Sequence, residues 1–160
     1  MADGTIFAKR DEGQALWMLG SLYDVKVGSD ATGGALTVIE MTIPPGQGTS
    51  PPPHKHDGGE AAYVLEGTVR FHSDGQTFEA SQGSFVYFPK GTLEWPEATG
   101  NVPARILAIY APGRIDKFFA EVAEPAKTRT LPPPPSGPPD VEKLVAAGKK
   151  YGLELEAPPH

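Results

Sequence analysis

Apolar and polar residues alternate in short segments over the first 111 residues of the chain. In residues 21–28, for example, Tyr23, Val25 and Val27 are separated by single polar residues. A period of two is typical of a β-strand with one buried face, because successive side chains point to opposite sides of a sheet. The pattern predicts strands at residues 14–18, 21–28, 35–43, 60–66, 68–72, 77–80, 84–88, 92–96 and 104–111.

Turn-forming residues separate these segments. Residues 44–46 and 89–91 each combine proline with glycine, and Asp74-Gly75 is a strong hairpin signal. Strands spaced about 8–12 residues apart, with turns between them, are typical of an all-β sandwich or barrel.

The pattern changes after residue 113. Residues 115–122 have the spacing of a short amphipathic helix, and residues 131–139 form a proline-rich stretch without helix or strand potential. A second helix is predicted at residues 141–151, with Asp140 as its N-cap and Gly152 as a candidate C-cap.

A chain of 160 residues is long enough for one domain with a core and too short for two ordinary domains. We expect a barrel over residues 1–113, N-terminal strands included, and a short helix packed on it at 114–124. A proline-rich linker at 125–139 then leads to a C-terminal helix and tail at 140–160.

The composition excludes several classes of partner. The net charge of −6 and the lack of a basic run disfavour nucleic acids and anionic membrane surfaces. The chain has no cysteine, so it can form neither a disulfide nor a thiolate metal site. The sequence shows no signal peptide and no apolar stretch of about 18 residues, so we expect a cytoplasmic protein that does not bind membranes.

One cluster of residues suggests metal binding. His54 and His56 are two residues apart, and Glu60 follows at an even spacing, so one face of a strand can present all three. Two histidines and a carboxylate on one face form an arrangement that leaves metal positions open to substrate or O₂. The alternative is a pair of exposed loop histidines after a proline-rich turn.

The residues around this cluster favour the metal site. Five residues separate Gly48 from His54, and six residues separate Glu60 from Gly67. With His56, these positions reproduce the first sequence motif of the cupin superfamily, which the chain therefore resembles.

The resemblance extends along the chain. Gly83, followed after five residues by Pro89 and then by Gly91, matches the start of the second cupin motif. Over about residues 12–122 the chain is similar to single-domain cupins described as quercetin 2,3-dioxygenase-like. The matching stretches are residues 15–20, 32–36, 44–46, 60–67 and 83–89.

The resemblance implies a fold and a site. The fold would be a double-stranded β-helix, the jelly-roll barrel of cupins, here with short C-terminal helices. One divalent metal ion would bind to His54, His56, Glu60 and a fourth ligand near residue 94. Glu60 would also be a candidate acceptor for a proton from the substrate hydroxyl.

The second motif departs from the family at the fourth ligand, where this chain has Glu94 in place of histidine. Two histidines and two carboxylates leave a divalent ion with no net charge, a weaker Lewis acid than a three-histidine site. Harder carboxylate ligands shift the preference among divalent ions away from copper, so we expect Mn, Fe, Zn or Ni. Three roles are open for Glu94: a metal ligand, a general acid or base beside the metal, or an outward-facing surface residue.

Five other residues are candidates for the surroundings of the site. Trp95 and Tyr63 are candidates for the cavity rim, although strand parity directs both away from the ligands. His72 is expected at a solvent-facing strand end. Phe118 and Phe119 either join the core or cap one end of the barrel.

Three functions follow for a small-molecule substrate. The first, which we favour, is an enzyme: an oxygenase that acts on a flavonol-like or enediol-like hydroxy-carbonyl compound. The second is a non-oxidative isomerase, lyase or cyclase with Glu94 as acid or base, and the third is a binding protein without catalysis. We also expect a homodimer, to which the N-terminal strands and the proline-rich arm could contribute contacts.

Overall fold

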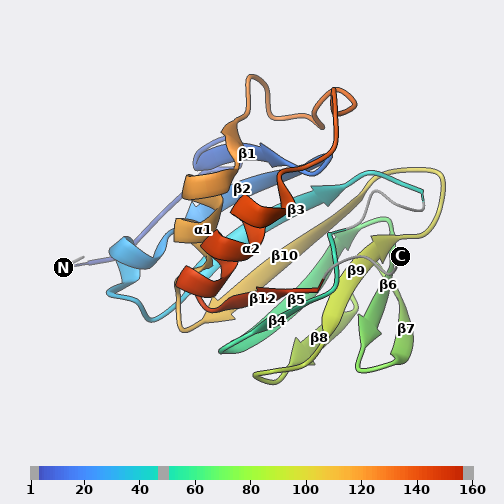
Figure 1. The fold of residues 1–160 in the computed structure, drawn as a ribbon, viewed down its shortest axis with the longest axis horizontal. Coiled ribbons are helices and arrows are strands. Elements are labelled where there is room, and N and C mark those ends of the chain that lie inside the picture. Colours follow the sequence, from blue (N-terminus) through green and yellow to red (C-terminus); the bar gives the residue numbers. More distant parts are fainter. Residues whose placement is uncertain (1–3, 47–50, 157–160) are drawn as a thin grey trace.

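Two antiparallel sheets face each other in the computed structural model, which describes residues 4–46 and 51–156 (Figure 1). The larger sheet consists, in spatial order, of β11 (Glu124–Pro125), β1 (Gln14–Met18), β2 (Ser21–Val27), β3 (Thr37–Ile43), β10 (Ala104–Ala111), β5 (Gly59–Glu66) and β8 (Phe85–Phe88). The smaller sheet consists of β12 (Leu153–Leu155), β4 (His54–His56), β9 (Glu94–Ala98), β6 (Thr68–Ser73) and β7 (Gln76–Ser81).

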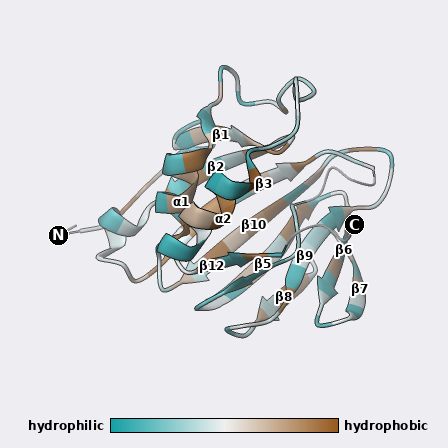
Figure 2. Cartoon of the chain, in the orientation of Figure 1, coloured by the Kyte–Doolittle hydropathy of each residue, from teal (hydrophilic) through white to brown (hydrophobic). Residues whose placement is uncertain are grey.

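The core lies between the two sheets and follows from the alternating pattern. In β3, Ile39, Met41 and Ile43 are buried while their neighbours are partly exposed. The adjacent strand β10 buries Ile106 and Ala108 in the same way, and Figure 2 shows hydrophobic residues along this strand. Burial of these apolar side chains on one face holds the register, because a slip of one residue would turn every one of them to solvent.

From β4 to β10 the chain crosses repeatedly between the sheets. β4 lies in the smaller sheet, β5 in the larger, β6 and β7 in the smaller, β8 in the larger, β9 in the smaller and β10 in the larger. This winding confirms the prediction of an all-β double-stranded β-helix with short C-terminal helices.

The nine predicted strands are all present, with ends that differ by at most two residues. The structure adds β4, β11 and β12, which are not among these nine and contain only two or three residues each. Such short strands exist because a partner supplies their hydrogen bonds: β11 pairs with β1, and β12 pairs with β4.

Two helices lie together over one side of the barrel, α1 (Ile115–Val122) and α2 (Val141–Lys150) (Figure 1). Both match the predicted segments. Asp140 is the predicted N-cap of α2, since its side chain accepts a hydrogen bond from the backbone N–H of Lys143 at 3.0 Å. No helix within the described residues is long and apolar enough to span a bilayer.

The proline-rich segment at residues 131–139 has no regular structure, as predicted, and it is held close to β1. The indole N–H of Trp17 donates to the carbonyl of Thr130 at 2.8 Å. β1 and this arm, the expected contacts of a second subunit, therefore interact with each other within one chain. The homodimer remains a prediction.

A carboxylate ties α1 to the larger sheet. One oxygen of Asp116 accepts hydrogen bonds from the backbone N–H and the hydroxyl of Ser29 at 3.0 and 2.9 Å. Its other oxygen accepts from the hydroxyl of Thr37, at 2.8 Å. Thr37 has no exposed surface, so its hydroxyl has no access to water as an alternative partner.

We predict that Asp116→Ala lowers the free energy of unfolding by about 2–3 kcal/mol, because it leaves the hydroxyl of Thr37 buried without its acceptor. Urea denaturation measures the change. The matched control is Asp30→Ala, which removes an exposed ion pair with Lys117, a residue of α1. It should leave the free energy of unfolding almost unchanged. Equal losses in the two variants would contradict this assignment.

Candidate metal centre

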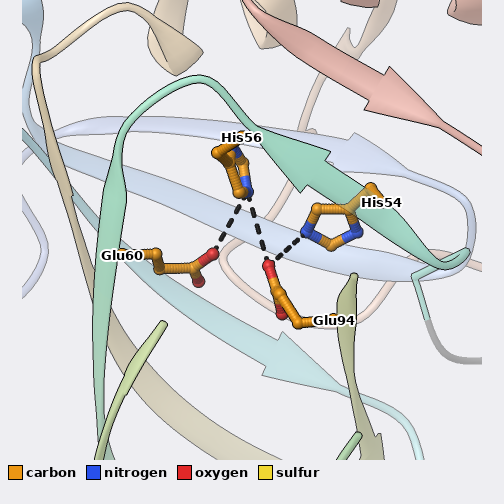
Figure 3. Close-up of side chains that lie close together, drawn as sticks. All are labelled: His54, His56, Glu60 and Glu94. Carbon is orange, nitrogen blue, oxygen red and sulfur yellow. Dashed lines mark ion pairs between the residues drawn. The ribbon is translucent and has the colours of Figure 1, made fainter. Parts of the chain in front are cut away.

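Four side chains from three strands converge between the sheets (Figure 3). His54 and His56 come from β4, Glu60 comes from β5, and Glu94 comes from β9. One ligand atom from each residue lies within 4.8 Å of those of the other three. The structure thus brings together the whole set of residues predicted as metal ligands.

The local sequence explains how β4 presents its histidines. His54 and His56 share a face of the strand because they are two residues apart. His54 stands directly opposite Glu94 of β9, so the strand pairing itself sets these two side chains beside each other. The predicted parity relation between the histidines is confirmed.

The expectation for Glu60 was wrong in one respect. Glu60 does not continue the face of the histidine strand, because β5 belongs to the other sheet. The chain turns between the sheets at Asp57 and Gly58. A Cβ atom on residue 58 would lie 2.6 Å from the carbonyl oxygen of Ala111, so this close approach requires glycine. Glu60 therefore approaches the histidines from across the barrel.

The distances are short and the carboxylates are deeply buried. Oε1 of Glu94 lies 2.7 Å from Nε2 of His54 and 3.5 Å from Nε2 of His56, and Oε2 of Glu60 lies 3.1 Å from the latter atom. Glu94 is 2% exposed and Glu60 is 5% exposed. The outward-facing alternative for Glu94 is thereby excluded.

The donor set fits a bound cation. Within the described residues, Nε2 of His56, Oε2 of Glu60 and Oε1 of Glu94 are buried side-chain atoms that make no hydrogen bond of acceptable geometry. Buried polar atoms normally have partners, and these three point at one another. Two imidazole nitrogens and two carboxylate oxygens around one point are suitable ligands for a divalent ion of the manganese, iron or zinc type.

A second contact orients His54. Its Nδ1 lies 2.7 Å from the carbonyl oxygen of Pro52, which can only accept, so Nδ1 carries a proton. In a neutral ring the lone pair of Nε2 then faces the carboxylate of Glu94. Such a contact is repulsive unless a proton or a metal ion lies between the two atoms, and a backbone carbonyl on the remote nitrogen is a common support for a metal-binding histidine.

The electrostatics of the site separate the two carboxylates. Burial raises the pKa of Glu60, and the charge of Glu94 adds to this, so that the pKa reaches about 7. Burial also opposes ionisation of Glu94, but the neighbouring His54 and His56 outweigh it and hold the pKa of Glu94 well below its usual value.

The histidines shift in the opposite sense to the usual effect of burial. Burial lowers the pKa of His56, but Glu60 and Glu94 outweigh it and raise the pKa to about 9. Burial likewise opposes the charged form of His54, and the carboxylate of Glu94 raises its pKa above the ordinary value. Without a cation, protons on the imidazoles balance the buried carboxylates.

A small cavity of about 40 Å³ lies beside the two histidines. Its walls are mainly apolar and include Tyr23, Met41, Phe118, Phe119 and Tyr110. Phe118 and Phe119 both belong to the core, which confirms the first of the two alternatives given for them, and they also line this cavity.

Tyr110 was not singled out as a site residue. Its ring centroid lies 5.1 Å from that of His56, and burial raises its pKa well above the usual value. Tyr110 pairs directly with Glu60 across β10 and β5. Its position alternates with the exposed residues of β10, which is the signal that could have placed it inside.

The predicted rim residues lie elsewhere. Tyr63 is 44% exposed on the outer face of β5, and Trp95 stacks on His72 at a centroid distance of 4.1 Å on the outer face of the smaller sheet. Both residues are an odd number of positions from the ligand on their strand, so they point to the opposite face although they are close to Glu60 and Glu94 in sequence. His72 lies outside the site, as predicted, and its Nε2 is 3.1 Å from Oε2 of Glu97.

Comparisons with known proteins agree with this architecture. Residues 39–110 match the family model described as "Cupin domain". The chain is 35% identical over 77 residues to an uncharacterized protein of Methanocaldococcus jannaschii, a match that covers 48% of this chain and 60% of that protein. The chain thus spans about three fifths of the length of this curated relative.

Solved structures resemble the fold. An RmlC-like cupin from Shewanella frigidimarina superposes with a TM-score of 0.60 at 15% identity, over 73% of this chain and 99% of that one. A predicted oxalate decarboxylase from Thermotoga maritima has a TM-score of 0.61 at 22% identity, over 66% of this chain and 98% of that one. Residues 39–110 therefore match a cupin domain, and the barrel that contains them has the double-stranded β-helix fold of the cupins.

Proposed function

We propose that this protein is a metal-dependent enzyme that acts on a small hydroxy-carbonyl compound. The observation that carries the proposal is the convergence of His54, His56, Glu60 and Glu94 in a buried site. There, Nε2 of His56, Oε2 of Glu60 and Oε1 of Glu94 make no hydrogen bond of acceptable geometry. A buried cluster of this kind, open to a cavity, is typical of a functional site rather than of a structural ion pair.

The two carboxylates are suited to different tasks. Glu94 contacts both histidines and stays ionised, which is what a permanent metal ligand requires. Of the two histidines, Glu60 contacts only His56, and it has a pKa near neutrality, so it is the better group to accept and return a proton. This assignment gives the acid–base role to Glu60 instead of Glu94, although both remain within reach of one ion.

A divalent ion held by these residues would supply a Lewis acid and, if it were iron or manganese, a redox partner for O₂. The chain itself would exclude bulk water, orient His54 through Pro52 and take the hydroxyl proton of the substrate on Glu60. The apolar cavity beside the histidines strengthens these electrostatic contacts by keeping the local dielectric constant low.

The oxygenase is the first candidate, supported by the sequence resemblance to quercetin 2,3-dioxygenase-like cupins. The second candidate is a non-oxidative isomerase, lyase or cyclase. It is favoured by a buried carboxyl group with a pKa of about 7, the property needed for proton transfer at neutral pH.

Oxygen dependence separates the two candidates. With Mn²⁺ or Fe²⁺ present, we expect consumption of O₂ together with loss of a flavonol such as 3-hydroxyflavone, followed with an oxygen electrode and by absorbance. Conversion that continues at the same rate under argon would favour the non-oxidative enzyme. Absence of conversion of flavonols and other enediol-like compounds, with every candidate metal and in both atmospheres, would contradict an enzymatic role.

Variants of the two carboxylates should differ in kind. Glu94→Gln should lose bound metal, because it removes the anionic ligand shared by both histidines. Glu60→Gln should bind metal at saturating concentration and yet lose activity by about 10²–10⁴-fold, the usual contribution of a general acid or base. Elemental analysis and turnover measure the two effects.

The matched control is Glu97→Gln, which changes the same strand as Glu94 but on its outer face, beside His72. It should keep both metal and activity. Retention of metal and activity in Glu94→Gln would remove any functional role for that residue.

Metal binding should also depend on pH. Protons occupy His56 and Glu60 up to pKa values of about 9 and about 7, and the metal must displace them. These raised pKa values stabilise the metal-free fold at low pH, and that contribution is lost as the pH rises through them. The melting-temperature increase caused by Mn²⁺ should therefore grow from pH 6 to pH 8.5.

Thermal unfolding under argon, with Mn²⁺ or with a chelator, measures this increase. His72→Ala, which removes the histidine outside the site, should leave the pH dependence unchanged. A melting-temperature increase that stays constant or shrinks as the pH rises would show that protons do not compete with the metal at these residues.

A further inference from the structure

A second, larger pocket lies next to the cavity of the metal centre. It measures about 340 Å³ and is enclosed by the turn between β1 and β2, the proline-rich segment and the start of α2. Three residues line both spaces: Met18, Leu19 and Leu144. These side chains therefore form the partition between the outer pocket and the inner cavity beside the histidines.

The backbone at the partition has an unusual conformation. Leu19 has a φ of +50°, in the left-handed region that bulky L-residues avoid. Within the described residues, the other non-glycine position with positive φ is Asp74, in an Asp-Gly hairpin where this conformation is well tolerated. Leu19 and Gly20 form the two-residue loop of the β1–β2 hairpin, in which both residues have positive φ, and this turn holds a large apolar side chain at the boundary of the two spaces.

The two volumes set a limit on the ligand. The inner cavity of about 40 Å³ has room for a group of only a few non-hydrogen atoms. The outer pocket of about 340 Å³ falls in the range of small-molecule sites. A substrate can therefore place only a small oxygen-bearing head beside His54 and His56, and its body must remain outside the partition.

The walls of the outer pocket favour a flat apolar body. Trp17 lines it with the small part of its ring that is exposed, and its indole N–H is already bound to Thr130. Charged groups are added to the lining by Glu124, Asp140 and Lys143. Pro132, Pro133 and Pro135 also line the pocket and lose little entropy when a ligand packs on them. Aromatic rings pack well against such surfaces.

We propose that the outer pocket binds the ring system of an aromatic hydroxy-carbonyl substrate, and that Leu19 admits only its head to the metal centre. This inference rests on the proposed function and names the substrate class and the route to the same site. Leu19 is a specificity residue in this scheme, because it selects by the width of the group that passes it.

A competing route exists on the other side of His56. A cavity of about 20 Å³ lies between His56 and the surface, and it is closed by the ion pair of Asp57 and Arg114. Any test of the Leu19 route must distinguish it from this side cavity.

Diethyl pyrocarbonate acylates neutral imidazoles. Its reaction with the metal-free protein at one pH near 9, where a large share of His56 is deprotonated, makes this distinction when the products are mapped by mass spectrometry. The reagent must enter the barrel to modify His54 and His56, whereas His72 on the outer face serves as an internal reference. Leu19→Gly widens the partition, and glycine accepts the positive φ. We expect the modification rate of His54 and His56, relative to His72, to rise by about tenfold, which corresponds to about 1.4 kcal/mol in the barrier to entry.

The aromatic probe is 3-hydroxyflavone. It should slow modification of His54 and His56 in the unmodified chain and leave His72 unaffected. Gly137→Phe should abolish this protection, because it adds a ring to a residue that lines the outer pocket and whose Cβ would meet no atom within 4 Å. Leu144→Ala provides a second way to widen the partition if Leu19→Gly does not fold.

Three results would overturn the proposal: no faster modification in either widened variant, faster modification in Arg114→Ala instead, or protection that survives Gly137→Phe. None of these measurements requires metal or turnover. A failure of the proposed function, seen as absent metal or absent conversion, is therefore distinct from a failure of this route.

Discussion

Two carboxylates buried within a few ångströms of each other need positive charge between them, and the centre of this barrel is built around that need. Glu60 and Glu94 sit where water cannot screen them, and His54 and His56 face them with ring nitrogens. Isolated buried charges of this kind would destabilise the fold by several kcal/mol. Either protons on the imidazoles or a divalent cation can balance them, so the protein's stability and its chemistry depend on the same charge balance.

The C-terminal part of the chain supports this centre. β4 pairs with β9 at a single position, His54 opposite Glu94, which is little support for a strand that carries two ligands. β12 supplies the other neighbour and pairs along the whole length of β4. The backbone N–H of Asp57 extends this contact by donating to the carbonyl of Gly152 at 2.9 Å. The helices and the final strand thus serve the site as well as the core.

Local patterns predicted most of this fold. Alternation gave the nine long strands, the cap at Asp140 gave the start of α2, and the spacing of His54, His56 and Glu60 indicated the cluster. The cluster was predicted correctly although Glu60 reaches it from the opposite sheet, because the chain turns directly from β4 into β5 and leaves Glu60 3.1 Å from His56. The role of Glu94 could not be predicted from its position in the sequence, because only the structure shows that this residue contacts both histidines.

Other features depend on distant parts of the chain and left no local signal. β12 is a strand because β4 is there to pair with it, and the neighbourhood of Tyr110 and His56 depends on the register of two strands. The positive φ of Leu19 also gave no signal in the sequence. A residue with positive φ before glycine in a turn is usually asparagine, aspartate or glycine, and leucine is not expected there.

The pairing of β4 with β12 also affects the order in which parts of the fold can form during synthesis. A chain emerges from the ribosome with its N-terminus first, so the strand that carries both histidines is made long before the strand that flanks it. Until Leu153 to Leu155 have been synthesised, β4 is an open edge that can pair with another chain. The late strand β12 therefore covers the edge of the strand that carries two of the candidate metal ligands.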